Sequence, residues 1–221
     1  MFIDALVHEF RAPLTAIRGY ASLLEETTNG DEKNFSIRIK EASARLVVLV
    51  NDFLEASRIQ SGKLKVTLVE IDVKKTIDKV LVDMKSLADI KNLELKTQFP
   101  TTPIQFLTDE KRLEQILTNI INNAIKYTNK GEILVSLEND HVYTTITIAD
   151  TGGGISAEDQ KKLFSPFVRV GSSDQNDKVV GSGLGMWITK KLVEQLHGEI
   201  SLESIKGVGT HVIIKLRNKV V

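Results

Sequence analysis

The 221-residue sequence contains no cysteine, so it forms neither a disulfide nor a metal site with thiolate ligands. Long apolar runs are also missing, since no stretch approaches the roughly 18 residues that cross a bilayer. The charges balance, with 29 basic and 29 acidic residues, so no partnership with nucleic acid or with an anionic membrane is indicated. We expect a cytoplasmic protein.

Two seams of apolar residues, each spaced alternately by three and four positions, predict two long helices at the start of the chain. A turn signal, Thr27–Asp31, separates them, and the second helix is expected to end near Gly62. Two helices have too little core to be stable alone, and the apolar run Leu46–Val50 is wider than one stripe. We therefore expect residues 1–62 to form a homodimer, as a four-helix bundle of two hairpins. The seams are Ile3, Leu6, Phe10, Pro13, Ile17, Tyr20 and Leu24, then Phe35, Ile39, Ala42, Leu46, Leu49, Phe53 and Ala56.

After Gly62 the pattern changes to helices mixed with short strands. Strands are expected at 64–71, 93–97, 104–107, 132–138 and 142–150 and in two final segments, and helices at 73–88, from the N-cap Asp109 to Tyr127, and at about 184–197. The predicted fold class is multidomain. An all-α helical hairpin, 1–62, precedes an α+β domain, 63–221, with helices on one face of a mainly antiparallel sheet.

Two glycine clusters flank a long polar segment of the second domain. Asp150–Ile155 (DTGGGI) directly follows a predicted strand, and Gly181–Met186 (GSGLGM) directly precedes a predicted helix. Glycines at a helix N-terminus let backbone N–H groups approach a polyphosphate closely. Each cluster alone is equally typical of tight turns. Their order around the polar residues 165–181 is typical of a lid or a binding loop.

Three asparagines fall within five residues of the predicted helix that ends at Tyr127, although asparagine is a mediocre helix former. Asn119 and Asn123 are four residues apart and share a face. A solvated polar stripe would account for them. So would a face whose amide oxygens coordinate a hydrated Mg²⁺ ion, which prefers few protein ligands together with waters and phosphates.

The segments NIINNAIK, DTGGGI, LFSPFVRV, GSGLGM and GVGT, in this order and spacing, resemble the N, G1, F, G2 and G3 boxes of the sensor histidine kinases of two-component systems. The opening stretch HEFRAPLTAIRGY resembles the H box of their HisKA dimerisation domain. The resemblance covers essentially the whole chain, and it implies that, if the chain is the cytoplasmic part of a membrane-bound sensor, the sensor domain is absent from this chain. It implies an ATP-binding domain of the GHKL or Bergerat type, ATP and Mg²⁺ as cofactors, and the receiver domain of a response regulator as partner.

The same resemblance implies roles for individual residues. His8 matches the phosphoacceptor, and Glu9 the acidic neighbour that orients it and helps to deprotonate it. Asn123 matches the Mg²⁺ ligand, and Asp150 the carboxylate that accepts a hydrogen bond from the adenine amino group. The other implied nucleotide contacts are Asn119, Lys126, Tyr127, Gly152, Gly154, Arg169, Gly181, Gly183, Leu184, Gly185 and Thr210.

With Ile3 at heptad position a, His8 falls at position f and faces away from the bundle. An exposed imidazole can take the γ-phosphoryl group from ATP and later meet an acceptor on another protein. Pro13 is predicted to bend or loosen the helix. Ala12 stands where the family often has Thr or Asn, a position associated with dephosphorylating the response regulator. We therefore expect weak phosphatase activity.

The expected function is ATP-dependent autophosphorylation of His8, followed by transfer of the phosphoryl group to an aspartate of a response regulator. Two alternatives stay open. One is a GHKL-type ATPase that uses nucleotide as a conformational clamp, with the hairpin only as a dimeriser. The other is a non-catalytic signalling scaffold.

Overall fold

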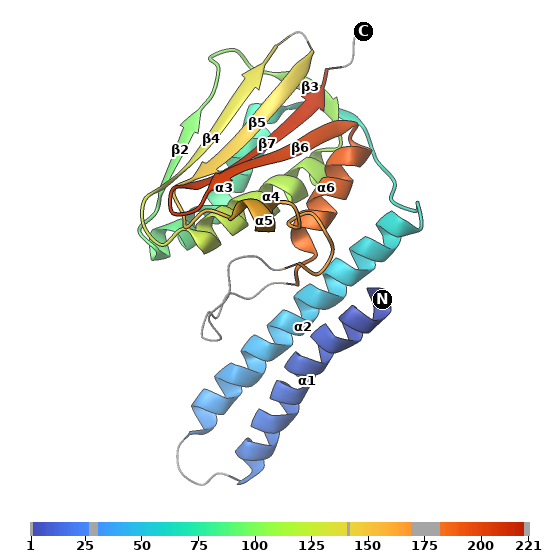
Figure 1. The fold of residues 1–221 in the computed structure, drawn as a ribbon, viewed down its shortest axis with the longest axis vertical. Helices are drawn as coiled ribbons and strands as arrows, with labels where there is room; N and C mark the ends of the chain where they lie inside the picture. Colours follow the sequence, from blue (N-terminus) through green and yellow to red (C-terminus); the bar gives the residue numbers. More distant parts are fainter. Residues whose placement is uncertain (1, 27–30, 141, 169–181, 219–221) are drawn as a thin grey trace. The chain divides into compact units, whose positions relative to one another are not determined.

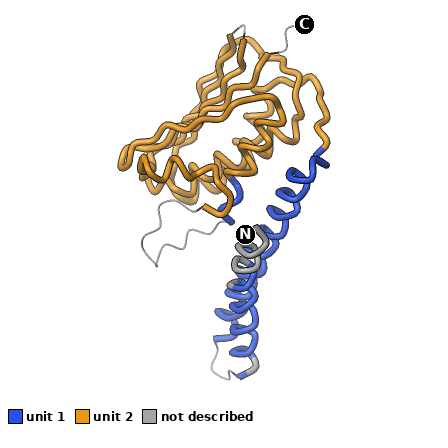
Figure 2. Tube along the Cα trace, turned by 45° about the vertical axis from the view of Figure 1, so that its right-hand side comes forward, with its two compact units in different colours: residues 1–64, 176–185 blue, residues 65–175, 186–221 orange. Residues whose placement is uncertain are grey.

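The computed structural model describes residues 2–26, 31–140, 142–168 and 182–218. Its helices and strands are labelled in Figure 1. In these ranges no helix combines the length and the apolar character needed to cross a membrane. The chain forms two compact units, which Figure 2 draws in different colours. Residues 1–64 and 176–185 make up the first unit, and residues 65–175 and 186–221 the second.

Two antiparallel helices dominate the first unit, α1 (Phe2–Glu26) and α2 (Glu32–Gln60), which confirms the predicted hairpin. Seam residues such as Ala42, Leu49 and Ala56 are buried. Near the turn the rings of Tyr20 and Phe35 stack with centroids 6.2 Å apart. Helix α2 ends where predicted, because Gly62 adopts a positive φ of 66° and its N–H donates to a carbonyl of the last turn.

Helix α1 continues through Pro13 without a break. The side chain of Pro13 is buried in the seam, as an apolar residue at that position should be. Proline has no N–H, so the carbonyl four residues earlier, at Glu9, loses its usual helical donor. The helix is therefore locally weakened at this turn but not interrupted.

One face of α2 carries large apolar side chains outside the seam. Val47, Val50 and Leu54 are 59%, 37% and 47% exposed. Their spacing of three and four residues places them on a common face. The apolar surplus that the sequence indicated around Leu46–Val50 is therefore present on the surface of the hairpin.

The second unit is an α+β domain whose five-stranded sheet has the order β2-β4-β5-β7-β6. Neighbouring strands are antiparallel except for β2 and β4, which are parallel. Helices α3, α4 and α6 lie on one face of this sheet (Figure 1), and β1 and β3 form a separate antiparallel pair. The elements are β1 (Val69–Asp72), α3 (Val73–Ile90), β2 (Glu94–Gln98), β3 (Gln105–Thr108), α4 (Glu110–Tyr127), β4 (Glu132–Asn139), β5 (Tyr143–Asp150), α5 (Ala157–Gln160), α6 (Gly185–Gln195), β6 (Gly198–Ile205) and β7 (Gly209–Arg217).

Two elements differ from the prediction. The strand expected over 64–71 is reduced to β1, because the backbone N–H of Thr67 donates to the Asp109 carboxylate at 2.8 Å instead of extending the ladder. The glycine-rich region contains the short helix α5, which begins at the N-cap Ser156. A helix of a single turn is too short to leave a periodic signal in the sequence.

The core lies between the sheet and its helices. Alternate residues of β4 and β5, such as Val135 and Ile148, are buried against apolar residues of α4 such as Ile116 and Ile120.

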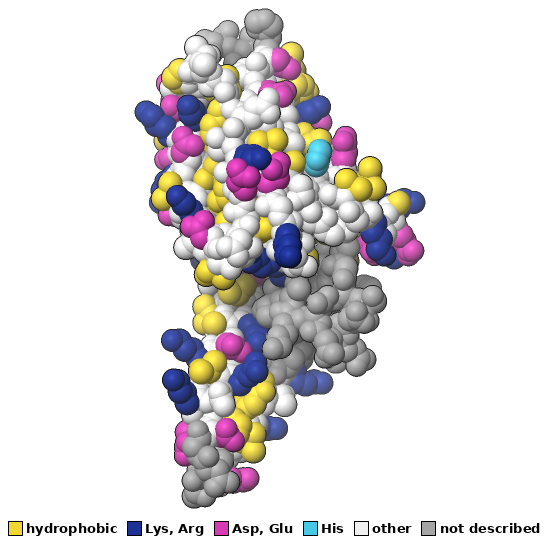
Figure 3. Space-filling view, turned by 90° about the vertical axis from the view of Figure 1, so that its left-hand side faces the viewer, with side chains coloured by type: hydrophobic (Ala, Val, Ile, Leu, Met, Phe, Trp, Pro, Cys, Tyr) yellow, Lys and Arg dark blue, Asp and Glu magenta, His cyan; other side chains and the backbone are white. Residues whose placement is uncertain are grey.

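On the face of the molecule that Figure 3 shows, basic and acidic side chains are interspersed with hydrophobic ones. No large patch of one charge gathers among the coloured residues in that view.

Candidate functional site

The two predicted asparagines of α4 point toward α6. The side-chain nitrogen of Asn119 donates to Thr189 Oγ1 at 2.7 Å, and that of Asn123 lies 3.4 Å from Met186 Sδ. Both side chains are half-buried. With the amide nitrogens directed at α6, the amide oxygens are the atoms suited to a hard cation such as Mg²⁺.

The described residues contain no group of three or more His, Cys, Asp or Glu that would hold a metal by themselves. A Mg²⁺ ion at Asn123 would therefore take few protein ligands. The rest of its octahedral shell would come from waters and phosphate oxygens, as is usual for this ion. The donor set fits a metal that arrives with a nucleotide.

Asp150 ends β5 and is partly buried. Its Oδ1 accepts a hydrogen bond from the backbone N–H of Gly152 at 2.8 Å, and the backbone N–H of Thr210, opposite it on β7, is a second donor. Burial raises the pKa of the Asp150 carboxyl above its ordinary value of 3.8, while these two N–H groups and the neighbouring His211 oppose the rise.

The glycines after Asp150 allow close packing of the chain on itself. A Cβ at Gly152 would come within 2.7 Å of the carbonyl oxygen of Tyr127. Gly154 has a φ of 62°, and a Cβ there would collide with the backbone of Ile205. The resemblance implied that these glycines make room for the base. In the structure their nearest neighbours are the end of α4 and the β6–β7 turn.

Thr210 lies beside Asp150 in the sheet, and the loop after Asp150 is held against β6. Ser204 Oγ lies 3.0 Å from Thr210 Oγ1 and accepts from the N–H of Ile155 at 2.8 Å. Gln160 Nε2 donates to the carbonyls of Ile155 and Ser204, each at 2.8 Å. Sequence reasoning missed Ser204 and Gln160, because single side-chain-to-backbone bonds leave no periodic pattern.

Two more residues of the predicted nucleotide set lie close to Asp150. Lys126 and Tyr127 end α4 beside the Asp150 turn, with the Lys126 ammonium 5.0 Å from the centre of the Tyr127 ring. Gly183, Leu184 and Gly185 belong to the first unit, where Gly183 has a φ of 71°, Leu184 is buried and Gly185 begins α6. Arg169 and Gly181 lie outside the described residues.

His8 and Glu9 lie in α1 of the first unit, whereas Asn123 and Asp150 belong to the second. The side chains of His8, Glu9 and Ala12 lie outside the described part of the structure. Their predicted chemistry therefore rests on their positions in the sequence and in the helix.

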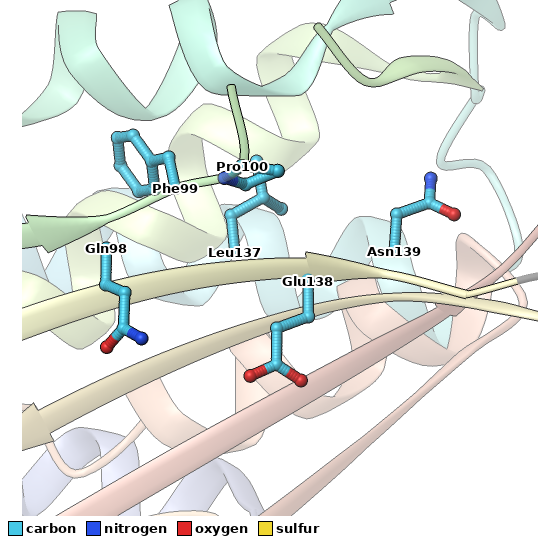
Figure 4. Close-up of a pocket in the computed structure, with 6 residues that line it drawn as sticks. All are labelled: Gln98, Phe99, Pro100, Leu137, Glu138 and Asn139. Atoms are coloured by element: carbon cyan, nitrogen blue, oxygen red, sulfur yellow. The ribbon is translucent and has the colours of Figure 1, made fainter. Parts of the chain in front are cut away.

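A cavity of about 370 Å³ lies away from Asp150 (Figure 4). Gln98, Phe99, Pro100, Leu137, Glu138 and Asn139 line it. Residues 98 and 139 end β2 and β4, whereas Asp150 pairs with Ile133 near the start of β4, so the cavity and the Asp150 turn are at opposite ends of the sheet. None of its lining residues belongs to the predicted site.

Comparison with known proteins identifies both parts of the chain. Residues 108–220 match the family described as "Histidine kinase-, DNA gyrase B-, and HSP90-like ATPase". Residues 1–62 match the "His Kinase A (phospho-acceptor) domain". The first match covers half of the chain, and together the two include the helical hairpin and most of the α+β domain.

Individual relatives agree with this assignment. The chain is 34% identical to the sensor histidine kinase GacS of Pseudomonas protegens over 222 residues, which cover 97% of this chain but only 24% of GacS. The structure of the Acinetobacter baumannii histidine kinase AdeS superimposes with a TM-score of 0.80 at 25% identity, covering 96% of this chain and 98% of that one. The histidine kinase ThkA, solved in complex with the response regulator protein TrrA, shares the fold at 24% identity and a TM-score of 0.78, covering 98% of this chain and 61% of that one.

These matches, the order of the two domains and the cluster at the end of β5 agree with one another. The chain spans about a quarter of the length of GacS. It belongs to the histidine kinase-, DNA gyrase B- and HSP90-like ATPase family and, with the phospho-acceptor domain before the ATP-binding domain, is the catalytic core of a sensor histidine kinase.

Proposed function

We propose that the protein phosphorylates its own His8 with ATP and then passes the phosphoryl group to an aspartate of a response regulator. One observation carries the proposal. A single chain matches a phospho-acceptor domain, with His8 in its first helix, and an ATPase domain, with Asn123 and Asp150 in the segments that resemble the family's N and G1 boxes. Residues 1–62 would provide dimerisation and phosphotransfer, and residues 63–221 would bind and activate ATP.

In the proposed reaction an imidazole nitrogen of His8 attacks the γ-phosphorus of ATP in line. A nitrogen–phosphorus bond forms as the bond to the bridging oxygen of ADP breaks. Glu9 would hold the other ring N–H and stabilise the positive charge that develops on the ring. In the second step an aspartate oxygen of the regulator attacks the same phosphorus, and the histidine leaves as neutral imidazole.

The nucleotide would be held by residues of the second unit. Asp150 would accept from the adenine amino group, and Asn123 would be a protein ligand of Mg²⁺, which would supply positive charge to offset that of the phosphates. Lys126 and Asn119 would face the phosphates, and Thr210 would lie beside the base. The remaining family positions of the described second unit, Tyr127, Gly152 and Gly154, would complete the pocket.

We also propose that the chain works as a homodimer through residues 1–62. The face formed by Val47, Val50 and Leu54 supports this, because exposed apolar residues on a two-helix hairpin favour burial against a second copy. The ThkA–TrrA complex supports a receiver domain as the second partner, at the level of shared fold. The cytoplasmic location expected from the sequence stays a prediction.

The test is incubation of the full chain with Mg²⁺ and ATP labelled at the γ-phosphate. We expect acid-labile, base-stable label on the protein, lost in His8→Gln while ATP still binds. His197→Asn serves as a matched control, since His197 is exposed and its φ of 57° suits asparagine; it should retain the label. Full labelling of His8→Gln would refute the assignment. ATP turnover without labelled protein would favour the ATPase clamp. The absence of both turnover and labelling would favour the non-catalytic scaffold.

A further inference from the structure

Lys91 follows the last residue of α3 and reaches the end of α4. Its ammonium nitrogen donates to the backbone carbonyl oxygens of Ile125 and Lys126 at 2.8 Å each, and of Thr128 at 3.2 Å. An ammonium group has three protons, so these bonds use all of its donors. All three acceptors are backbone carbonyls, and the residue is half-buried.

These three bonds act on a part of α4 that the helix itself leaves unsatisfied. The last four carbonyls of a helix have no partner within it, and a positive charge there also interacts favourably with the helix dipole. The backbone position of Lys91 is fixed in turn, because its N–H bonds to Ala88 and the next residue, Asn92, reverses the chain with a φ of 54°. The ammonium group therefore clamps the end of α4 from a rigid turn.

The segment held by Lys91, residues 125–128, packs against the turn that follows Asp150. The carbonyl oxygen of Tyr127 and the hydroxyl of Thr128 lie 2.7 Å and 3.0 Å from where a Cβ at Gly152 would be. Gly152 donates its N–H to the Asp150 carboxylate at 2.8 Å. Residues 127 and 128 therefore fill the space beside Gly152 that a Cβ would need, so the position of the end of α4 bears on Gly152 and, through its N–H, on the Asp150 carboxylate.

We infer that Lys91 is a positioning residue for the adenine side of the proposed nucleotide site. It holds the end of α4 against the Asp150–Gly152 turn and so aims the carboxylate at the 6-amino group of the base. The inference rests on the proposed function, because it assumes that Asp150 reads the base. Lys91 itself contacts only backbone carbonyls in the described structure and would not touch the nucleotide.

The experiment measures dissociation constants of the full chain for ATP and for purine riboside triphosphate, which lacks the 6-amino group. The variants are Lys91→Met, which keeps the length of the stem but removes all donors, Lys91→Gln, which keeps a shorter donor, and Lys91→Arg as the conservative rescue. Lys85→Met is the matched control, since Lys85 is an exposed lysine of α3, the helix that ends just before Lys91. Thermal unfolding of each protein sets a temperature at which all of them are folded.

We expect Lys91→Met to reduce the preference for ATP over the analogue by about tenfold, the scale of losing one well-aimed charge-assisted hydrogen bond. Lys91→Arg should recover most of this preference, Lys91→Gln should fall between them, and Lys85→Met should match the wild type. A purely structural cap would lower the unfolding temperature but leave the preference unchanged, and that result would overturn the inference. If Lys91→Met does not fold, the test is the preference for ATP over the analogue in Lys91→Gln and Lys91→Arg. A preference that is lower in the Gln variant and largely kept in the Arg variant supports the inference, and an unchanged preference in both overturns it.

The same data separate the inference from the function on which it rests. A wild-type protein that binds ATP and the analogue equally well would show that Asp150 does not read the base, and the proposed nucleotide site would fail. A wild-type preference that persists in every Lys91 variant would reject the role of Lys91 alone.

Discussion

Replacing Asp150 by Asn should make the free protein more stable at neutral pH and make it a poorer binder of ATP. Burial raises the pKa of this carboxyl above 3.8, so ionising it in the folded protein costs more than in the unfolded chain. A raised carboxyl pKa contributes stability only at low pH. That contribution is lost as the pH rises through the folded-state pKa, so at pH 7 the free protein bears the whole cost.

The asparagine variant removes this cost while keeping the local geometry. Its side-chain oxygen can still accept from the N–H of Gly152, which lies 2.8 Å from Asp150 Oδ1. Its NH₂ group would then face the adenine amino group, and because both groups are hydrogen-bond donors, no hydrogen bond could form between them. Losing one charge-assisted hydrogen bond should weaken ATP binding by roughly 10- to 100-fold, which corresponds to about 1.5–3 kcal/mol.

The assay combines chemical denaturation of the nucleotide-free proteins between pH 4 and pH 8 with ATP titrations at pH 7.5. The stability advantage of Asp150→Asn should be smallest at pH 4, close to the ordinary carboxyl pKa of 3.8, grow until the pH exceeds the raised pKa of the folded protein, and then stay constant. Asp89→Asn, at an exposed aspartate near the end of α3, is the control and should lack this profile. An asparagine variant that is less stable than the wild type at pH 7, or that binds ATP equally well, would refute the reasoning.

Three further predictions address the metal, the dimer and the phosphatase. Asn123→Asp should leave adenine binding nearly unchanged but slow Mg²⁺-dependent labelling by roughly 10- to 100-fold, as disturbing a metal's ligand sphere does; equal labelling rates at saturating ATP would contradict a ligand role. Val47→Glu should raise the dimer dissociation constant measured by sedimentation about tenfold or more, because an unpaired charge would be buried, whereas Val48→Glu on another side of α2 should not. A larger effect of Val48→Glu than of Val47→Glu would place the interface elsewhere. Ala12→Thr should speed the decay of the phosphorylated regulator in the presence of ADP by roughly tenfold, because the threonine hydroxyl would orient the attacking water, and should leave autophosphorylation unchanged. Equally fast decay with the wild type and the variant would show that Ala12 does not limit the phosphatase activity.

Local patterns in the sequence were sufficient for most of the helices and strands, whereas the candidate site residues came from the family resemblance. The apolar seams predicted α1 and α2, and strand alternation predicted the β4–β5 hairpin. The N-cap Asp109 was recognised from the residue type alone, and its carboxylate indeed accepts from the N–H of Arg112. These features depend on residues a few positions apart, so their physics is already complete in a short window of sequence.

Only the tertiary structure decided the features that join distant segments. The parallel pairing of β2 with β4 connects residues almost 40 positions apart, and nothing in either strand's alternation specifies its direction. The bonds from Lys91 to the end of α4, and from Gln160 to Ser204, likewise link a side chain to backbone groups more than 30 residues away. Any lysine or glutamine has the donors for such bonds. Which of them bonds to a distant carbonyl is therefore set by the packing of the sheet and helices, and that packing exists only once the chain has folded.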